Sequence, residues 1–139
     1  MNFKSYSAIA LGLTGLLLAG MGVYFIFLRP PLLPEDLNYM GTTLQNVKNN
    51  TPGRFDWLQK VFWVMGGYIF TTGLLIIFIA MTSFGTRMNT AFIIIVIAGF
   101  TSIGLMTIVN FIIDSDFKLI LLAFTLPWLL ALILYRNKK

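Results

Sequence analysis

The chain has 139 residues, of which 58% are hydrophobic and only 11% charged, whereas soluble globular proteins carry about 25% charged residues. Its net charge is +5, and it contains neither cysteine nor histidine. The composition indicates a membrane protein, and the two missing residue types exclude disulfide chemistry, thiolate metal sites, histidine-ligated haem and histidine as a general base.

The first apolar segment, residues 6–28, predicts an uncleaved membrane-spanning helix. About 20 apolar residues cross a hydrocarbon layer of about 30 Å, and a signal peptide has a shorter apolar run of about 7–15 residues. Small residues recur at spacings of three and four, which places them on one face and allows close helix packing. We expect this face to be the inner seam of the bundle, with an oligomer interface as the alternative. The small residues are Ala8, Gly12, Gly15, Ala19 and Gly22.

A long polar connection, residues 29–60, follows the first span. Prolines at positions 30 and 31 end the helix, and Pro34 followed by Glu35 and Asp36 predicts a short helix that Gly41 stops. The form of residues 42–50 stays open. Residues 54–60 mix aromatic and charged side chains, which is typical of a segment at the lipid headgroups.

The second span, residues 61–82, repeats the small-residue pattern of the first. Gly66, Gly73 and Ala80 are seven residues apart, and Gly67 and Thr71 add to the pattern. We therefore expect the first two spans to form a tight pair.

The third and fourth spans, residues 91–113 and 117–135, are joined by a very short connection and must be antiparallel neighbours. The third span contributes Ala98 and Ser102 as small packing residues. In the fourth, Pro127 removes a backbone hydrogen bond and predicts a kink, and we expect Trp128 to be a packing or lipid-facing residue.

Together the four spans predict an all-α polytopic membrane protein with a single domain, residues 1–139. It is an antiparallel four-transmembrane-helix bundle, and its ordered first connection contains short interfacial helices. The two sides of the membrane carry five basic residues each, so the basic tail alone favours cytoplasmic termini. The charge of +5 predicts attraction to anionic lipid and no binding of nucleic acid.

One group of polar residues is a candidate pocket. Thr107, Asn110 and Asp114 share a face of the third span, and Tyr68 lies in the same half of the membrane. Polar groups in lipid are costly and therefore mark functional sites. The alternative is that Asn110 and Asp114 only satisfy hydrogen bonds inside the bundle.

A lid over that pocket is a further prediction. The first connection should fold back so that Arg29 or Arg54 pairs with Asp114 or Asp116, because partly desolvated charges persist only when they are paired. Phe55 and the neighbouring Trp57 should then lie at the headgroup boundary.

Three segments resemble small uncharacterised bacterial inner-membrane proteins with four predicted spans: FLRPPLLPEDLNYMG (27–41), VFWVMGGY (61–68) and NFIIDSDFK (110–118). The resemblance implies a location in the bacterial inner membrane. It implies no activity and no functional residue.

Our main hypothesis is a non-catalytic integral membrane protein that acts through protein partners, as an accessory subunit, a scaffold or a homo-oligomer. The alternative is a binder or carrier of a small amphiphile such as a lipid or quinone. An enzyme is not expected, and neither is a cofactor or metal, although hydrolysis assisted by Asp114 stays formally open. Without an ionisable residue near the centre of any span, proton-coupled export of the small multidrug type is not expected.

Overall fold

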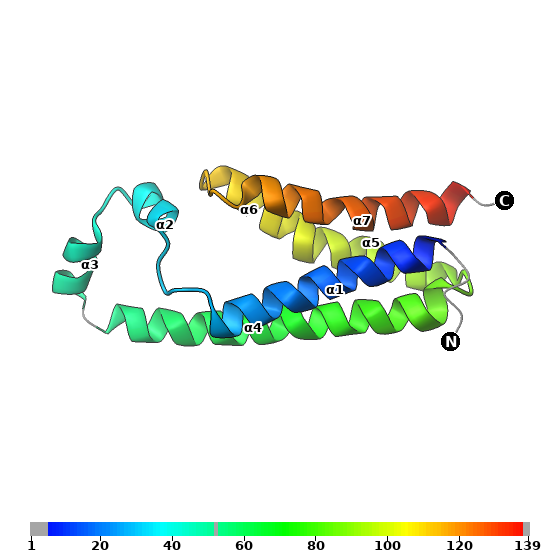
Figure 1. The fold of residues 1–139 in the computed structure, drawn as a ribbon, viewed down its shortest axis with the longest axis horizontal. Coiled ribbons are helices and arrows are strands. Elements are labelled where there is room, and N and C mark those ends of the chain that lie inside the picture. The colour runs from blue at the N-terminus through cyan, green and yellow to red at the C-terminus, as the bar shows by residue number, and fades with distance from the viewer. Residues whose placement is uncertain (1–5, 52, 138–139) are drawn as a thin grey trace.

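The computed structural model describes residues 6–51 and 53–137 and contains four helical spans (Figure 1). The predicted all-α four-span membrane bundle is confirmed. The first turn of α1 and the last turn of α7 lie at the same end of the bundle (Figure 1). The spans are α1 (Tyr6–Phe27); α4 (Arg54–Ile79) with the π-helical turn η1 (Ala80–Phe84); α5 (Asn89–Gly99), the π-helical turn η2 (Phe100–Gly104) and α6 (Leu105–Ile112); and α7 (Lys118–Asn137).

The seam between α1 and α4 is a contact of backbone against backbone. A Cβ atom added at Gly73 would lie 2.5 Å from the Ala19 nitrogen and 2.6 Å from the Gly15 oxygen, and one added at Gly22 would lie 2.5 Å from the Phe70 nitrogen. Only residues without a side chain permit this approach, which maximises van der Waals packing in lipid. The predicted tight pair is confirmed. Of the predicted packing residues, Ala8, Gly15, Ala19, Gly22, Gly66, Gly73 and Ala80 are buried and Gly12 is half-buried.

Two residues assigned to this seam lie elsewhere. A Cβ at Gly67 would meet no atom within 4 Å, and Thr71 is exposed. Successive helix residues are rotated by about 100°, so Gly67 faces away from the seam that its neighbour Gly66 occupies.

The order of packing is α4, α1, α7 and then the third span, because α1 contacts both α4 and α7 and α7 contacts α5, η2 and α6. Trp128 of α7 is a packing residue: it is buried, and its indole Nε1 donates a hydrogen bond to the Ile95 oxygen (3.1 Å). The indole fits only because Gly99 has no side chain, since a Cβ there would overlap it.

The third span departs from the regular helix that its composition predicts. Gly99 directly precedes the π-helical turn η2, and Gly104 is the last residue of the turn. π-Helical turns are rare and occur mostly as single turns inside α-helices. Pro127 lies inside α7, and the predicted kink there stays a prediction.

The first connection contains two short helices, α2 (Pro34–Tyr39) and α3 (Leu44–Asn50). The predicted helix at Pro34 is confirmed, and Gly41, with φ of 63°, follows it. Thr43 caps α3 by accepting a hydrogen bond from the Asn46 N–H (3.3 Å). Residues 54–60 are not a separate interfacial segment, since they form the first turns of α4, which extends beyond the end of α1 (Figure 1).

Candidate site at the first-connection end

The four residues of the predicted polar pocket are not gathered around one cavity. The hydroxyl of Thr107 and the amide of Asn110 each donate to the carbonyl four residues earlier in their own helix, at 2.8 and 2.9 Å. Tyr68 is 73% exposed on the outer side of α4. Asp114 is exposed and pairs with Lys118. Asn110, whose bond stays within its own helix, and Asp114, which pairs with a nearby base, therefore fit the structural alternative.

The predicted pairing of Arg29 with Asp114 or Asp116 is wrong. Arg29 Nη2 instead donates to the carboxylate of Asp36, seven residues later, at 3.3 Å. The same carboxylate accepts from the Leu33 N–H (2.9 Å) at the start of α2. The guanidinium carbon of Arg29 lies 3.5 Å from the centre of the Phe62 ring, which is a cation–π contact with α4. Arg29 thus fixes α2 to the ends of α1 and α4.

The side chain of Arg29 is only 10% exposed. Burial lowers the pKa of the Arg29 guanidinium from its ordinary value, and the Asp36 carboxylate opposes that shift. Because removing the acid would leave a partly desolvated charge without compensation, Arg29 and Asp36 act as one structural unit.

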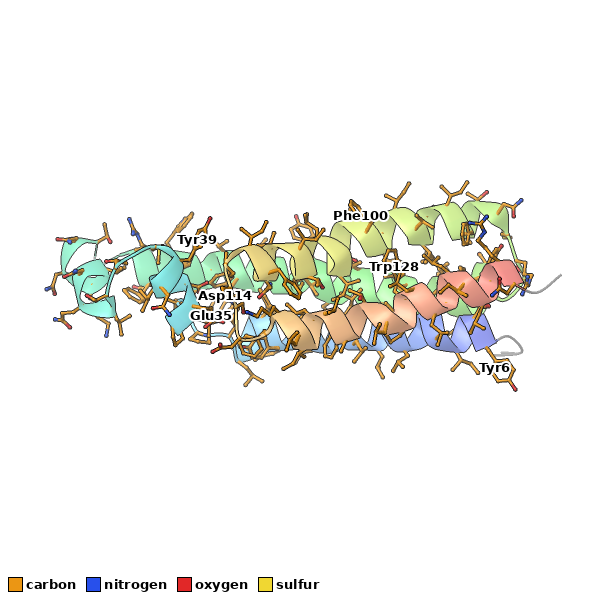
Figure 2. The ribbon with its side chains drawn as sticks, turned by 90° about the horizontal axis from the view of Figure 1, so that it is seen from above. Tyr6, Glu35, Tyr39, Phe100, Asp114 and Trp128 are labelled. Carbon is orange, nitrogen blue, oxygen red and sulfur yellow. The ribbon has the colours of Figure 1, made fainter. Side chains whose placement is uncertain are left out.

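The first connection does fold back onto the third connection, but through a contact that the sequence did not predict. The buried carboxylate of Glu35 in α2 accepts a hydrogen bond from the Ser115 hydroxyl at 3.0 Å. Ser115 oxygen in turn accepts from the Phe117 N–H (3.1 Å), in a turn where Asp114 has φ of 53°. Glu35 and Asp114 lie at the same end of the bundle, opposite Tyr6 (Figure 2).

We predict that the bond between Glu35 and Ser115 holds α2 in place. Ser115→Ala removes the donor and leaves a buried carboxylate short of a partner, which should cost about 1–3 kcal/mol. Hydrogen exchange of the α2 amides should therefore accelerate at least several-fold. The control is Asp116→Ala, a substitution of the exposed neighbour. Unchanged exchange in Ser115→Ala would show that α2 is held by Arg29 alone.

A hollow of about 650 Å³ lies between α2, α3 and the first turns of α4. A second hollow of about 230 Å³ shares three of its residues and reaches Phe62 and Ile113. The mixed composition of residues 54–60 was the only signal of this site in the sequence. The larger hollow is lined by Leu32, Met40, Asn50, Thr51, Gly53, Arg54, Trp57 and Leu58.

The chemistry available at this end is that of binding. The hollow offers apolar walls beside one cation, which suits a molecule that is part apolar and part anionic. Within residues 6–51 and 53–137, no three acidic side chains come together as a metal site. Comparisons of the chain with protein-family models, curated proteins and solved structures find no match.

Proposed function

We propose that this multi-pass membrane protein is non-catalytic and acts by binding another membrane-spanning helix with the outer face of α4. The observation that supports this is the exposure of polar groups within the span. Tyr68 is 73% exposed, and the exposed Thr71 lies about 15 Å from Val61 along the helix, near the centre of a hydrocarbon layer of about 30 Å.

Polar groups at that depth are more stable against protein than against lipid. Lipid offers no hydrogen-bond partner to the hydroxyl groups of Tyr68 and Thr71, whereas a neighbouring helix does. Gly67, four residues before Thr71, has open space around it and permits close approach. The opposite face of α4 uses Gly66 and Gly73 in the same way to pack against α1. α4 therefore has two faces suited to helix packing, of which α1 covers one.

Self-association is the form of this function that we favour. Two copies of the α4 face can pack against each other about a two-fold axis, which is the commonest symmetry of homo-oligomers. An accessory or scaffolding role beside a different membrane protein is the alternative. For the location, we propose the bacterial inner membrane with cytoplasmic termini, supported by the sequence resemblance and the basic tail.

We predict that Gly67→Leu abolishes association. A Cβ atom at Gly67 meets no atom within 4 Å in the single copy, so we expect folding to be unaffected, but the leucine side chain would hold a second helix away. The control is Gly20→Leu on α1, where a Cβ also meets nothing within 4 Å. Light scattering after purification in mild detergent should give a multiple of the monomer mass for wild type and Gly20→Leu, and the monomer mass for Gly67→Leu. A strictly monomeric wild type with no co-purifying protein contradicts the proposal.

A further inference from the structure

The charges of the first connection are divided between two roles. Both acids of α2 are engaged within the fold, Asp36 with Arg29 and the buried Glu35 with Ser115. They therefore contribute little negative charge to the surface that α3 and α4 present.

That surface is basic. On α3 and the first turns of α4, the exposed charged side chains are three bases, Lys48, Arg54 and Lys60, and one acid, Asp56. Lys60 Nζ lies 4.0 Å from the centre of the Trp63 ring, and Lys48 Nζ lies 5.9 Å from that of Phe55. Arg54 lines the larger hollow, and among the residues that the structure describes it forms no ion pair.

The hollow lies at the depth of the lipid headgroups. Trp57 and Leu58 precede Val61, the first residue of the apolar run, by about 5 Å along α4, and Arg54 precedes it by about 10 Å. The interfacial region extends about 5–8 Å beyond the hydrocarbon on each side. The Arg54 backbone lies a few ångströms beyond this region, but its long side chain can reach back into it. A phosphate held by the guanidinium would then occupy the same level as the phosphates of the surrounding bilayer.

A mainly apolar path leads from the hollow towards the membrane, and the one acid along it, Asp36, is paired with Arg29. Leu32, Met40 and Leu58 line both hollows, and the smaller one continues to Phe62 and to Ile113, directly after α6. A free phosphate would gain nothing from these walls. A molecule with an anionic head and an acyl chain would bury its apolar part along them.

We propose that the hollow between α2, α3 and α4 is a binding site for an anionic phospholipid. Arg54 binds the phosphate, the Trp57 ring and Leu58 pack against the glycerol region, and one acyl chain follows Met40 and Leu32 towards the bilayer. The site is independent of the outer face of α4 at Gly67, so either proposal can fail without the other.

The test is a titration of the delipidated full-length protein in mild detergent, followed by native mass spectrometry. The probes are dioleoyl phosphatidylglycerol and dioleoyl phosphatidylcholine, which share acyl chains and differ in charge. One basic residue near an anionic headgroup is worth about fivefold in affinity, so wild type should bind phosphatidylglycerol about fivefold more tightly. Arg54→Gln should bind both lipids equally. Arg136→Gln, the same charge loss on an exposed residue near the end of α7, should keep the preference.

A second variant tests the hollow without changing charge. Gly53→Leu adds a side chain to its lining, where a Cβ meets nothing within 4 Å, and should weaken binding of both lipids several-fold. Gly20→Leu is the matched control and should bind as wild type does. Equal binding of the two lipids by wild type, an unchanged preference in Arg54→Gln, or unchanged binding in Gly53→Leu overturns the proposal. Displacement of the lipid by millimolar inorganic phosphate overturns it too, since the site would then be one for free anions.

Discussion

Gly73→Ala is expected to separate α1 from α4 and to lower the free energy of unfolding by about 3 kcal/mol. The added methyl group would lie 2.5 Å from the Ala19 nitrogen and 2.6 Å from the Gly15 oxygen. Both are backbone atoms, which cannot rotate away as the end of a flexible side chain can. The two helices must therefore move apart, and that movement loosens the close contacts along the whole seam.

Thermal unfolding in mild detergent, followed by circular dichroism, measures this effect. Gly20→Ala is the matched control because it makes the same substitution on the partner helix α1 at an exposed position with open space. Replacing glycine by alanine at an exposed helix position is neutral or slightly stabilising. Gly73→Ala should therefore lower the melting temperature, whereas the control should leave it unchanged or raise it slightly. Equal melting temperatures for Gly73→Ala and wild type would mean that the α1–α4 seam is looser than described.

Gly99→Ala is expected to expel the Trp128 indole from its place against α5. The new methyl group would overlap the ring, and the hydrogen bond from Nε1 to the Ile95 oxygen would be lost with the packing. Removing a buried tryptophan from a core costs about 3–5 kcal/mol, and we expect a loss near that range. Because α7 lies between α1 and the third span, the displacement should weaken contacts on both sides.

The near-ultraviolet circular dichroism of Trp128 reports its expulsion when Trp57 and Trp63 are replaced by phenylalanine. In that background Gly99→Ala should remove most of the remaining tryptophan signal. In a double-mutant cycle with Trp128→Leu, the losses in the free energy of unfolding should be strongly non-additive, since the smaller leucine side chain makes room for the methyl group. Gly85→Ala, whose nearest contact would be an ordinary 3.8 Å, is the control. Additive effects of Gly99→Ala and Trp128→Leu would contradict the overlap.

The spans and their first pairing were predictable because both depend on local composition. The length of an apolar run fixes a membrane-spanning helix, and residues seven apart, such as Gly66 and Gly73, return to the same face. The face itself was less certain, because Gly66 and Gly67 are equally small and point in different directions. Thr71 was assigned to the wrong face for the same reason.

The candidate site was harder to predict from the sequence because it depends on contacts between distant segments. Arg29 pairs with Asp36, seven residues away, in preference to the more distant Asp114, since closing a short loop costs less entropy. The hollow takes its walls from the residues on either side of α2, from the end of α3 and from the first turns of α4, so no single segment reveals it. Nothing in the local pattern around Glu35 indicated Ser115, which lies 80 residues further along the chain.

That separation fixes an order of events during synthesis. At about 5–20 residues per second, the ribosome reaches Ser115 about 4–16 seconds after it has made Glu35. Both α1 and α4 have been synthesised before then, because both helices precede the third span. Until then the Glu35 carboxylate has no Ser115 hydroxyl from which to accept a hydrogen bond. The bond from Ser115 to Glu35 is therefore the later of the two attachments of α2, and the contact through Arg29, Asp36 and Phe62 can form first.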